Sequence, residues 1–365
     1  MTGGGTGGHV IPALAVAREL CRRGHQCFFI GSRRGLEAKL VPAAGFPIEW
    51  IEIGGLKRVG LAQTLRTLGQ LPWSVAVAGR LLARRGTAAV FSTGGYVAGP
   101  VMLAAGLRRI PLVVMEPNAM PGFANRRASL WVRRALLNFP EAARFFPRDR
   151  AEITGLPVRD EFFSLPPKPR GEELTILVTG GSQGSRTLNR AVVASVPLFR
   201  EARLRVRFLH QAGALQFEDI ARQAREAGLP GEVAAFLDDM PAAFSRADLI
   251  VCRAGAGAVA ELAAAGKPSV LVPLPHAADD HQLHNAQALE RAGAARLVLD
   301  REMTGQRLFD EIAGLAGDPG ALETMGAAAR SLARPGAAGR AADALEQCAR
   351  NGGLTGRPKS RNNTI

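Results

Sequence analysis

The sequence predicts an α/β protein made of two Rossmann-like halves, each with its own parallel sheet. Three observations lead to this fold class. Short apolar runs alternate with segments of helical period, which is the pattern of parallel α/β architecture. A glycine-rich loop opens each half, at Gly3–Gly8 and at Gly180–Gly184. Residues 157–173 are rich in proline and charge and are expected to form a linker between the halves. The 365 residues also exceed one core of ordinary size.

The first half, residues 1–156, is expected to hold strands and helices in alternation. Each strand candidate is an apolar run that ends at glycine, proline or a polar residue. The strands are expected at 27–31, 88–93, 111–116, 135–139 and 151–154, and the helices at 12–23, 34–44, 61–86 and 97–108. The uncharged stretch 88–107 contains "STGGYVAGP", so a strand, a loop and a short helix explain it better than a membrane span.

The second half, residues 174–335, restarts the same plan. "LTILVTGGSQGSRTLNRAV" (174–192) is predicted to form a strand, a glycine loop and a helix. A further helix is expected at 336–350, and the polar tail 351–365 is expected to be disordered. The remaining strands of this half are expected at 206–211, 233–237, 248–253 and 268–274.

The first glycine loop has almost nothing before it. In a doubly wound sheet a central strand precedes such a loop, and here Met1 and Thr2 alone stand there. Omission of a central strand leaves open hydrogen bonds and an unfilled slot in the core. We therefore expect the first strand to be missing, through a start codon further upstream or a trimmed chain.

The positive charge is concentrated in the first half. The chain carries a formal net charge of +14, and residues 1–160 hold 22 Lys and Arg against 9 Asp and Glu. An anionic partner, either nucleic acid or anionic lipid, explains this asymmetry. The alternative is a solvated basic surface in an arginine-rich proteome. The four cysteines lack metal-type spacing and are expected to be reduced thiols of a cytoplasmic protein.

Glycine loops of this kind bind phosphates, because glycine lets the ligand approach the backbone N–H groups closely. "GGGTGG" fits the dinucleotide fingerprint, but Ser32-Arg33 stands where an acid is expected. Arginine there suits NADP, so an oxidoreductase remains an alternative. "CRAGAGAVAEL" (252–262) suggests a helix whose N-terminus, near Ala256, faces a diphosphate. Glu261 then lies one turn in, where it can accept hydrogen bonds from ribose, unless it is a solvated residue of a plain turn.

A polar cluster in "PHAADDHQLHNA" (275–286) suggests either a metal site or a sugar site. His281 and His284 lack the flanking pattern of a zinc helix and form a weak ligand set with His276, Asp279 and Asp280. Gln282 and Asn285 suit the recognition of sugar hydroxyls. We therefore predict no metal here, and we interpret "DDM" (238–240) as a helix N-cap.

Taken together and in order, these motifs resemble one family closely, over residues 3 to about 350. The resemblance is to the bacterial peptidoglycan N-acetylglucosaminyltransferases, which act on lipid I. The motifs that carry it are "GGGTGGHVIPALAVA", "TGGYVAGP", "EPNAMPGFANR", "GLPVR", "GGSQGSRTLN", "FLDDM", "RAGAGAVAEL" and "AAGKPSVLVPLPHAADDHQLHNA".

The resemblance implies a GT-B fold of two Rossmann-like domains with a cleft between them. It implies inverting transfer of GlcNAc from UDP-GlcNAc to undecaprenyl-pyrophosphoryl-MurNAc-pentapeptide (lipid I), giving lipid II with a β-1,4 bond. It implies a peripheral enzyme on the cytoplasmic face of the membrane, with no cofactor, no metal and no nucleic-acid partner.

Donor-binding residues follow from the same resemblance. Thr6, Gly7 and Gly8 match the loop that faces the transferred sugar. The other matches are Asn118 and Gln282 for the sugar, Arg159 and Ser182 near the nucleotide, Leu237 for uracil, and Ala256, Gly257, Ala258, Val259, Ala260 and Glu261 for phosphate and ribose. The chain departs from the usual family pattern at Met115 and Pro117, at Leu156, and in the alanines of "RAGAGAVAE".

An inverting transfer needs a base that takes a proton from the acceptor hydroxyl. His9 and Glu116 are the two candidates, and His9 alternatively only positions the substrate. A UDP-sugar epimerase of the same fold and a basic nucleic-acid-binding protein are the competing functions. The latter lacks support, because the chain has one tyrosine, Tyr96, and no interleaved aromatic and basic motif.

The segment 61–86 is a candidate membrane contact, because apolar residues flanked by cations are typical of interfacial binding. The alternative is an ordinary amphipathic helix packed on the sheet. The apolar group is Leu65, Leu68, Trp73, Val75 and Leu82, and the cations are Lys57, Arg58, Arg66, Arg80, Arg84 and Arg85.

Overall fold

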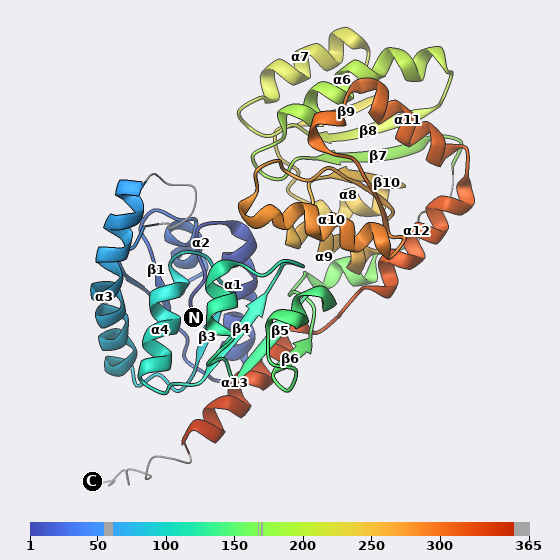
Figure 1. Cartoon of the computed structure of the whole chain (residues 1–365). Coiled ribbons are helices and arrows are strands. Elements are labelled where there is room, and N and C mark those ends of the chain that lie inside the picture. The colour runs from blue at the N-terminus through green and yellow to red at the C-terminus, as the bar shows by residue number, and fades with distance from the viewer. Residues whose placement is uncertain (55–60, 167, 169–170, 354–365) are drawn as a thin grey trace. The chain divides into compact units, whose positions relative to one another are not determined.

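The computed structural model describes residues 1–54, 61–166, 168 and 171–353 and divides the chain into two compact units (Figure 1). Unit 1 comprises Met1–Pro157 together with the segment from Gly336 onward, and unit 2 comprises Val158–Pro335. The chain therefore leaves the first unit, builds the second, and returns to the first with its last helix. That helix extends to Gly353, so the first residues of the expected tail are helical, and the rest lies outside the described residues.

Unit 1 contains a parallel sheet made of two hydrogen-bonded sets of strands. One set has the order β1-β2 and the other has the order β3-β4-β5-β6, and all neighbours are parallel. The strands are β1 (Phe29–Gly31), β2 (Ile48–Trp50), β3 (Val90–Ser92), β4 (Leu112–Glu116), β5 (Arg134–Leu137) and β6 (Ala151–Ile153).

Thr2 joins the two sets of strands. It forms parallel bridges with Ile30 of β1 and with Ser92 of β3. The N–H of Thr2 donates to the carbonyl of Phe91 at 2.9 Å, and the N–H of Ile30 donates to the carbonyl of Met1 at 3.0 Å. We expected the central strand to be missing. At the level of Thr2 the chain's first two residues occupy its place, and a cavity of about 660 Å³ lies beside Met1.

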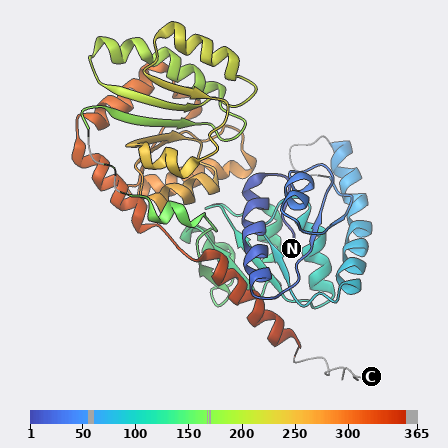
Figure 2. The same cartoon turned by 180° about the vertical axis from the view of Figure 1, so that it is seen from behind.

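Helices cover both faces of the unit-1 sheet (Figures 1 and 2). Ala78 and Leu82 of α3 and Val101 of α4 share one core with inward residues of β3, β4 and β5. Helices α1 and α13 pack against each other, and α13 also contacts β4. The helices are α1 (Gly7–Arg22), α2 (Glu37–Ala43), α3 (Leu61–Arg84), α4 (Ala98–Leu107), α5 (Phe123–Ala128), the 3-10 turn η1 (Pro140–Phe145) and α13 (Ala337–Gly353).

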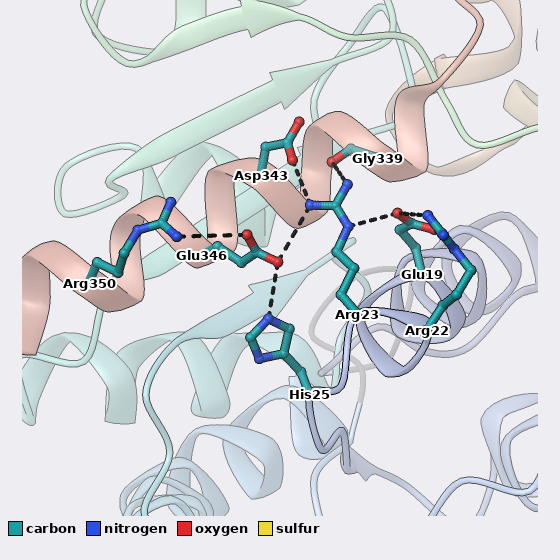
Figure 3. Close-up of polar contacts among 8 residues, drawn as sticks. All are labelled: Glu19, Arg22, Arg23, His25, Gly339, Asp343, Glu346 and Arg350. Carbon is teal, nitrogen blue, oxygen red and sulfur yellow. Dashed lines mark hydrogen bonds and ion pairs between the residues drawn. The ribbon is translucent and has the colours of Figure 1, made fainter.

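Arg23 fastens α13 to the end of α1 (Figure 3). Its guanidinium bonds Glu19 at 2.7 Å, Asp343 at 2.6 Å and the carbonyl of Gly339 at 3.3 Å. Beside it, Nε2 of His25 lies 3.0 Å from Glu346. The segment that follows unit 2 is thereby held on unit 1 by charge-assisted bonds as well as by apolar packing.

Unit 2 contains a six-stranded parallel sheet with the order β12-β11-β10-β7-β8-β9. Chain order reverses beside β7, which is therefore the switch point of a doubly wound sheet. The strands are β7 (Leu174–Thr179), β8 (Val206–Gln211), β9 (Gly231–Ala234), β10 (Leu249–Cys252), β11 (Ser269–Leu271) and β12 (Ala295–Leu297).

One core of unit 2 lies between its sheet and the helices α6 and α11. Leu188 and Val192 of α6 and Ile312 of α11 pack there against Val178 and Phe208 of the sheet. The helical elements are η2 (Asp160–Ser164), α6 (Arg186–Glu201), α7 (Phe217–Ala227), α8 (Met240–Arg246), α9 (Ala256–Ala265), η3 (Ala278–Asp280), α10 (His281–Arg291), η4 (Asp300–Glu302), α11 (Gly305–Ala316) and α12 (Pro319–Ser331).

Most expected elements are present, and the differences have local causes. Helix α1 begins at Gly7, five residues before the expected start at residue 12. Proline favours a first helical turn and glycine disfavours helix interiors, so local propensity moves the predicted start to Pro12. Burial of Val10 outweighs that preference. The short strands β2 and β12 and the helices α5, α7, α11 and α12 were not predicted.

Candidate active site

Three loops of unit 1 meet at the carboxyl ends of its parallel strands, which is where open α/β sheets bind ligands. They are Gly3–Gly8 after Thr2, residues 93–97 after β3, and residues 117–122 after β4. The first two are in backbone contact: the N–H of Gly4 donates to the carbonyl of Gly94 at 3.3 Å. Gly95 has a φ of 89°, and a Cβ on it would collide with the carbonyl oxygen of Gly4. Glycine is therefore required at this crossing.

His9 lies in the first turn of α1, directly after the glycine loop. Its Nδ1 is 2.8 Å from the carbonyl oxygen of Thr93, and the Thr93 hydroxyl donates to the carbonyl of His9 at 2.7 Å. A carbonyl only accepts, so Nδ1 is the protonated nitrogen of the ring. In the neutral imidazole this tautomer puts the lone pair on Nε2, the atom that can accept a proton. Thr6 and Gly8 beside it are exposed.

Glu116 ends β4 and is buried, with 1% of its surface exposed. Its Oε1 accepts from the backbone N–H of Asn118 at 3.0 Å and from the Asn118 side chain at 3.3 Å. Its Oε2 accepts from the N–H of Gly122 at 3.1 Å and from Nδ2 of Asn125 at 2.9 Å. Burial raises the pKa of Glu116 to about 7 against these four bonds. The carboxyl group thus organises the loop 117–122 from inside.

The glycine loop of unit 2 is held by Gln211, the last residue of β8. Nε2 of Gln211 donates to the Thr179 hydroxyl at 3.1 Å and to the carbonyl of Gly181 at 2.9 Å. Its Oε1 accepts from the N–H of Leu237 at 2.9 Å. One buried amide therefore sets the position of Leu237 relative to the loop that carries the exposed Ser182.

Helix α9 starts at Ala256, after the extended residue Gly255, and its first turn contains no acidic residue. A Cβ on Gly257 would meet no atom within 4 Å, so the space beside this residue at the helix start is open. Such a helix start attracts anions. Glu261 is half-buried one turn further on, and burial raises its pKa to about 7 against the nearby charge of Arg159.

Arg159 and Gln282 occupy different parts of unit 2. Arg159 is exposed, and its guanidinium lies 5.1 Å from the ring centre of Phe162. Oε1 of Gln282 accepts from the N–H of Leu274 at 2.9 Å, so this amide shapes the segment before α10. In that segment His276, Asp279 and Asp280 all have positive φ, near 50–60°. Strained residues of this kind cluster at functional sites.

Arg253 is a residue of the unit-2 site that sequence reasoning missed. It follows β10, is paired with Asp300 at 2.6 Å, and donates to the Ser185 hydroxyl at 2.6 Å. It also donates to the carbonyls of Val272 and Pro273. Arg253 thus ties the start of α6 to the segment after β11. Its position at the end of an apolar strand run was the available signal. Gln211 was missed too, because it falls inside a predicted strand.

The described residues contain no group of three His, Cys, Asp or Glu side chains placed to hold a metal ion. His276, His281, His284, Asp279 and Asp280, the cluster weighed as ligands, therefore do not converge in this part of the chain. All four cysteines are unpaired thiols.

The candidate membrane segment 61–86 differs in part from the prediction, because two of its apolar residues face the core and two of its arginines are paired. Leu82 is 2% exposed and Val75 packs against the core, so these two residues face the protein interior. Arg84 and Arg85 both pair with Glu49, at 2.9 and 2.7 Å. Lys57 and Arg58 lie outside the described residues, and so do the side chains of Leu65, Arg66 and Leu68. Trp73 is 65% exposed, with the Arg80 guanidinium 5.2 Å from its ring centre.

Further exposed apolar residues of unit 1 stand at the end of α4 and after α5. Leu107 at the end of α4 is 71% exposed and Leu130 is 80% exposed. A Cβ on Gly79 of α3 would lie 3.0 Å from the Arg108 guanidinium, which therefore crosses α3. We call Trp73, Arg80, Leu107, Arg108, Arg109 and Leu130 the basic–apolar surface. No helix in the described ranges is long and apolar enough to cross a membrane.

Comparison with known proteins decides the family. The N-terminal domain model of glycosyltransferase family 28 matches residues 1–137, and the C-terminal domain model of that family matches residues 175–346. The chain is 60% identical over 350 residues to the UDP-N-acetylglucosamine–N-acetylmuramyl-(pentapeptide) pyrophosphoryl-undecaprenol N-acetylglucosamine transferase of Solibacter usitatus, covering 96% of each chain. It belongs to this transferase family.

Two further proteins of this transferase family match the chain over nearly its whole length. The Halorhodospira halophila protein of the same name is 46% identical, covering 95% of this chain and 97% of the relative. The crystal structure of Acinetobacter baumannii MurG superposes with a TM-score of 0.83 at 34% identity, covering 95% of this chain and 98% of that one. The GT-B fold expected from the sequence is thereby confirmed. A UDP-GlcNAc 2-epimerase of Neisseria meningitidis, at 14% identity and a TM-score of 0.61, shares the fold alone.

Proposed function

We propose that this protein is an inverting glycosyltransferase that moves GlcNAc from UDP-GlcNAc to lipid I and forms lipid II with a β-1,4 bond. The observation that carries the proposal is the full-length identity of 60% to an N-acetylglucosamine transferase of this name. The loops at the carboxyl ends of both sheets supply groups suited to the reaction. Family membership alone would leave the roles of individual residues open, so the roles of Leu237, His9 and Glu116 below rest on contacts, and the remaining roles follow the family resemblance.

Unit 2 binds the nucleotide in this proposal. The N–H groups of Ala256, Gly257 and Ala258 at the start of α9 face the diphosphate, with Val259 and Ala260 next in the same turn, and Glu261 accepts from the ribose hydroxyls. Leu237, held by Gln211, contacts uracil beside the loop that carries Ser182. Arg159 supplies positive charge near the nucleotide. In unit 2 Gln282 is assigned to the sugar. The unit-1 residues Thr6, Gly7, Gly8 and Asn118 keep the sugar-binding role that the family resemblance gives them.

His9 is the base that removes the proton from the acceptor hydroxyl. The support is its tautomer: Nδ1 donates to the carbonyl of Thr93, and Nε2 carries the lone pair. Glu116 is assigned the positioning role, because four hydrogen bonds hold its buried carboxyl group among Asn118, Gly122 and Asn125. As the bond to UDP breaks, negative charge grows on the diphosphate, and the α9 dipole together with Arg159 stabilises it. This mechanism uses no cofactor and no metal ion.

A transfer assay tests the function. The protein is incubated with UDP-GlcNAc and a lipid I analogue, and UDP release and the disaccharide product are measured by mass spectrometry and by the anomeric NMR coupling. We expect equimolar UDP and a β-linked product, and no change in UDP-GlcNAc when the acceptor is omitted. Conversion of UDP-GlcNAc to its C2 epimer without acceptor would instead support an epimerase. Tight, salt-sensitive binding of DNA or RNA would support the nucleic-acid alternative.

We further propose that the enzyme is peripheral to the cytoplasmic face of the membrane, where lipid I is reached, and that the basic–apolar surface of unit 1 makes the contact. Exposed Trp73, Leu107 and Leu130 beside exposed Arg80 and Arg108 fit an interface of apolar boundary and anionic headgroups. Each arginine near such a surface contributes about 1 kcal/mol.

Vesicle co-sedimentation at rising phosphatidylglycerol content tests the membrane contact. The variant Trp73→Ser/Arg80→Glu/Arg108→Glu should bind vesicles weakly and keep its affinity for UDP. The matched control, Leu215→Ser/Arg207→Glu/Arg225→Glu in unit 2, makes the same changes of charge and apolar exposure. Equal sedimentation of the first variant and the wild type would remove this surface from the membrane contact.

A further inference from the structure

A second buried carboxyl group of unit 1, Glu37, touches the glycine loop directly. Glu37 is the first residue of α2 and is 1% exposed. Its Oε2 accepts from the N–H of Gly5 at 2.9 Å. Its Oε1 accepts from the N–H of Ser32 at 3.1 Å and from the Ser32 hydroxyl at 2.8 Å. The carboxyl group therefore joins the end of β1 to the loop that leads into α1.

Three glycines leave the space that this carboxyl group fills. A Cβ on Gly31 would lie 2.9 Å from Cγ of Glu37, and one on Gly4 would lie 2.7 Å from its Cδ. A Cβ on Gly35 would collide with its Oε2. A buried carboxylate is costly unless it is hydrogen-bonded, and apolar side chains fill such space at lower cost. The close fit of the protein around this carboxylate therefore indicates that its role is to hold its hydrogen-bond partners in place.

The contact reaches Tyr96 as well. The Ser32 hydroxyl lies 2.7 Å from the Tyr96 hydroxyl. An ionised carboxylate only accepts, so the single Ser32 proton is directed to Glu37, and Tyr96 becomes the donor to Ser32. The Tyr96 ring lies against the loop, since a Cβ on Gly5 would be 3.2 Å from its Cε1. Glu37 thus fixes the glycine loop at Gly5 and, through Ser32, the aromatic ring beside it.

We propose that Glu37 is a positioning residue for the transfer reaction: its carboxylate holds the loop Gly3–Gly8 so that Thr6 and His9 meet the substrate. The inference rests on the proposed function. Gly5 has a φ of 91°. Glycine adopts this backbone conformation readily but does not restrict the chain to it, so the hydrogen bond to Glu37 is what holds the loop in this conformation. Thr6 follows at the next position, and α1 begins with Gly7.

The test compares Glu37→Gln with the wild type in the transfer assay. An amide can accept on one side only, and the orientation that keeps both Ser32 bonds puts its NH₂ group against the N–H of Gly5. We expect kcat to fall between tenfold and several hundredfold, while the dissociation constant of UDP, bound by unit 2, changes less than twofold. Exchange of the amide hydrogens in residues 4–9 should become faster, because the bond that holds the loop is lost.

Glu311→Gln is the matched control, since Glu311 is a buried carboxylate of unit 2 bonded to Arg296 and Arg307. It should lower the melting temperature without lowering kcat more than twofold. Ser32→Ala provides a second variant that leaves Glu37 in place, with an expected threefold to tenfold loss of kcat. If Glu37→Gln does not fold, the kcat of Ser32→Ala tests the proposal in its place.

The outcomes separate the two proposals. A wild type that transfers no GlcNAc overturns the proposed function and, with it, the role of Glu37. An active wild type with a folded Glu37→Gln variant within twofold of its kcat overturns the role of Glu37 alone. If the Glu37→Gln variant fails to fold, a Ser32→Ala variant whose kcat stays within twofold of the wild type also overturns the role of Glu37.

Discussion

Substitution of His9 separates a base from a residue that only positions the loop. His9→Ala removes Nε2 together with the bond from Nδ1 to the carbonyl of Thr93. His9→Asn removes Nε2 but keeps that bond, because the amide nitrogen of asparagine takes the place of Nδ1. The two variants therefore differ in the Thr93 contact and share the loss of the proton acceptor.

The structure sets the magnitudes. Loss of a general base costs about 10²–10⁴ in kcat, which is roughly 3–5 kcal/mol in the barrier. The cost to folding is far smaller, because His9 is half-buried and its bond to the carbonyl of Thr93 contributes about 1 kcal/mol. Alanine in the first turn of α1 regains part of it through helix propensity. Activity should thus collapse at nearly unchanged stability.

Steady-state transfer kinetics and thermal unfolding, measured on the same preparations, provide the assay. We expect both variants to lose kcat by 10²–10⁴ with melting temperatures within a few degrees of the wild type. Recovery of kcat to within tenfold in His9→Asn would refute the reasoning, because the Thr93 bond and not the base would then carry the effect. A loss below tenfold in both variants, with Glu116→Gln severely impaired, would transfer the role to Glu116.

Further outcomes are expected for Glu261, Gln211 and Arg23. Glu261→Ala should raise the KM for UDP-GlcNAc by about 5–150-fold, or roughly 1–3 kcal/mol for a lost polar contact. Because the pKa of Glu261 is raised to about 7 and the ionised form accepts from ribose, the wild-type KM should rise as the pH falls from 8 to 6, with a flat profile in Glu261→Gln. Gln211→Leu should lower the melting temperature by several degrees and weaken UDP binding in titration calorimetry, because the buried Thr179 hydroxyl and the backbone groups of Gly181 and Leu237 lose their partner. Arg23→Met should lower the melting temperature at unchanged kcat, since it frees α13 from α1; an unchanged melting temperature would show that apolar packing suffices there.

Much of the fold could be predicted because its signals are local. The run at 206–211 alternates with helical segments and is bounded by charge, and β8 spans those same residues. The strands β2 and β12 have three residues each and lie at sheet edges, so no run in the sequence marks them. They exist because a neighbouring strand offers its backbone groups. The early start of α1 was missed for a related reason, since burial of Val10 outweighs the preferences of Gly7 and Pro12.

The candidate site likewise has parts that could be predicted from the sequence and parts that could not. Its glycine loops could be placed from the sequence, because close backbone approach and positive φ require glycine at particular spacings. The residues that hold these loops could not be placed. Glu37 lies in no motif, and Arg253 stands in "RAGAGAVAEL" without any sign of what it contacts, since a charged residue is expected at the surface until its partners are known. The prediction for Leu82 was wrong in the opposite direction. This apolar residue stands beside arginines and was therefore expected to contact lipid, but it is buried in the core.

The sequence by itself determined the two Rossmann-like halves, the glycine loops and the family to which they belong. Periodicity, glycine spacing and collinear motifs are properties of short segments, and they are readable before folding. The tertiary structure alone decided which carboxyl groups are buried, which nitrogen of His9 is protonated, and which arginines are already paired. These depend on partners distant along the chain, such as Thr93, 84 residues from His9, because burial and hydrogen bonding are fixed when separate segments meet.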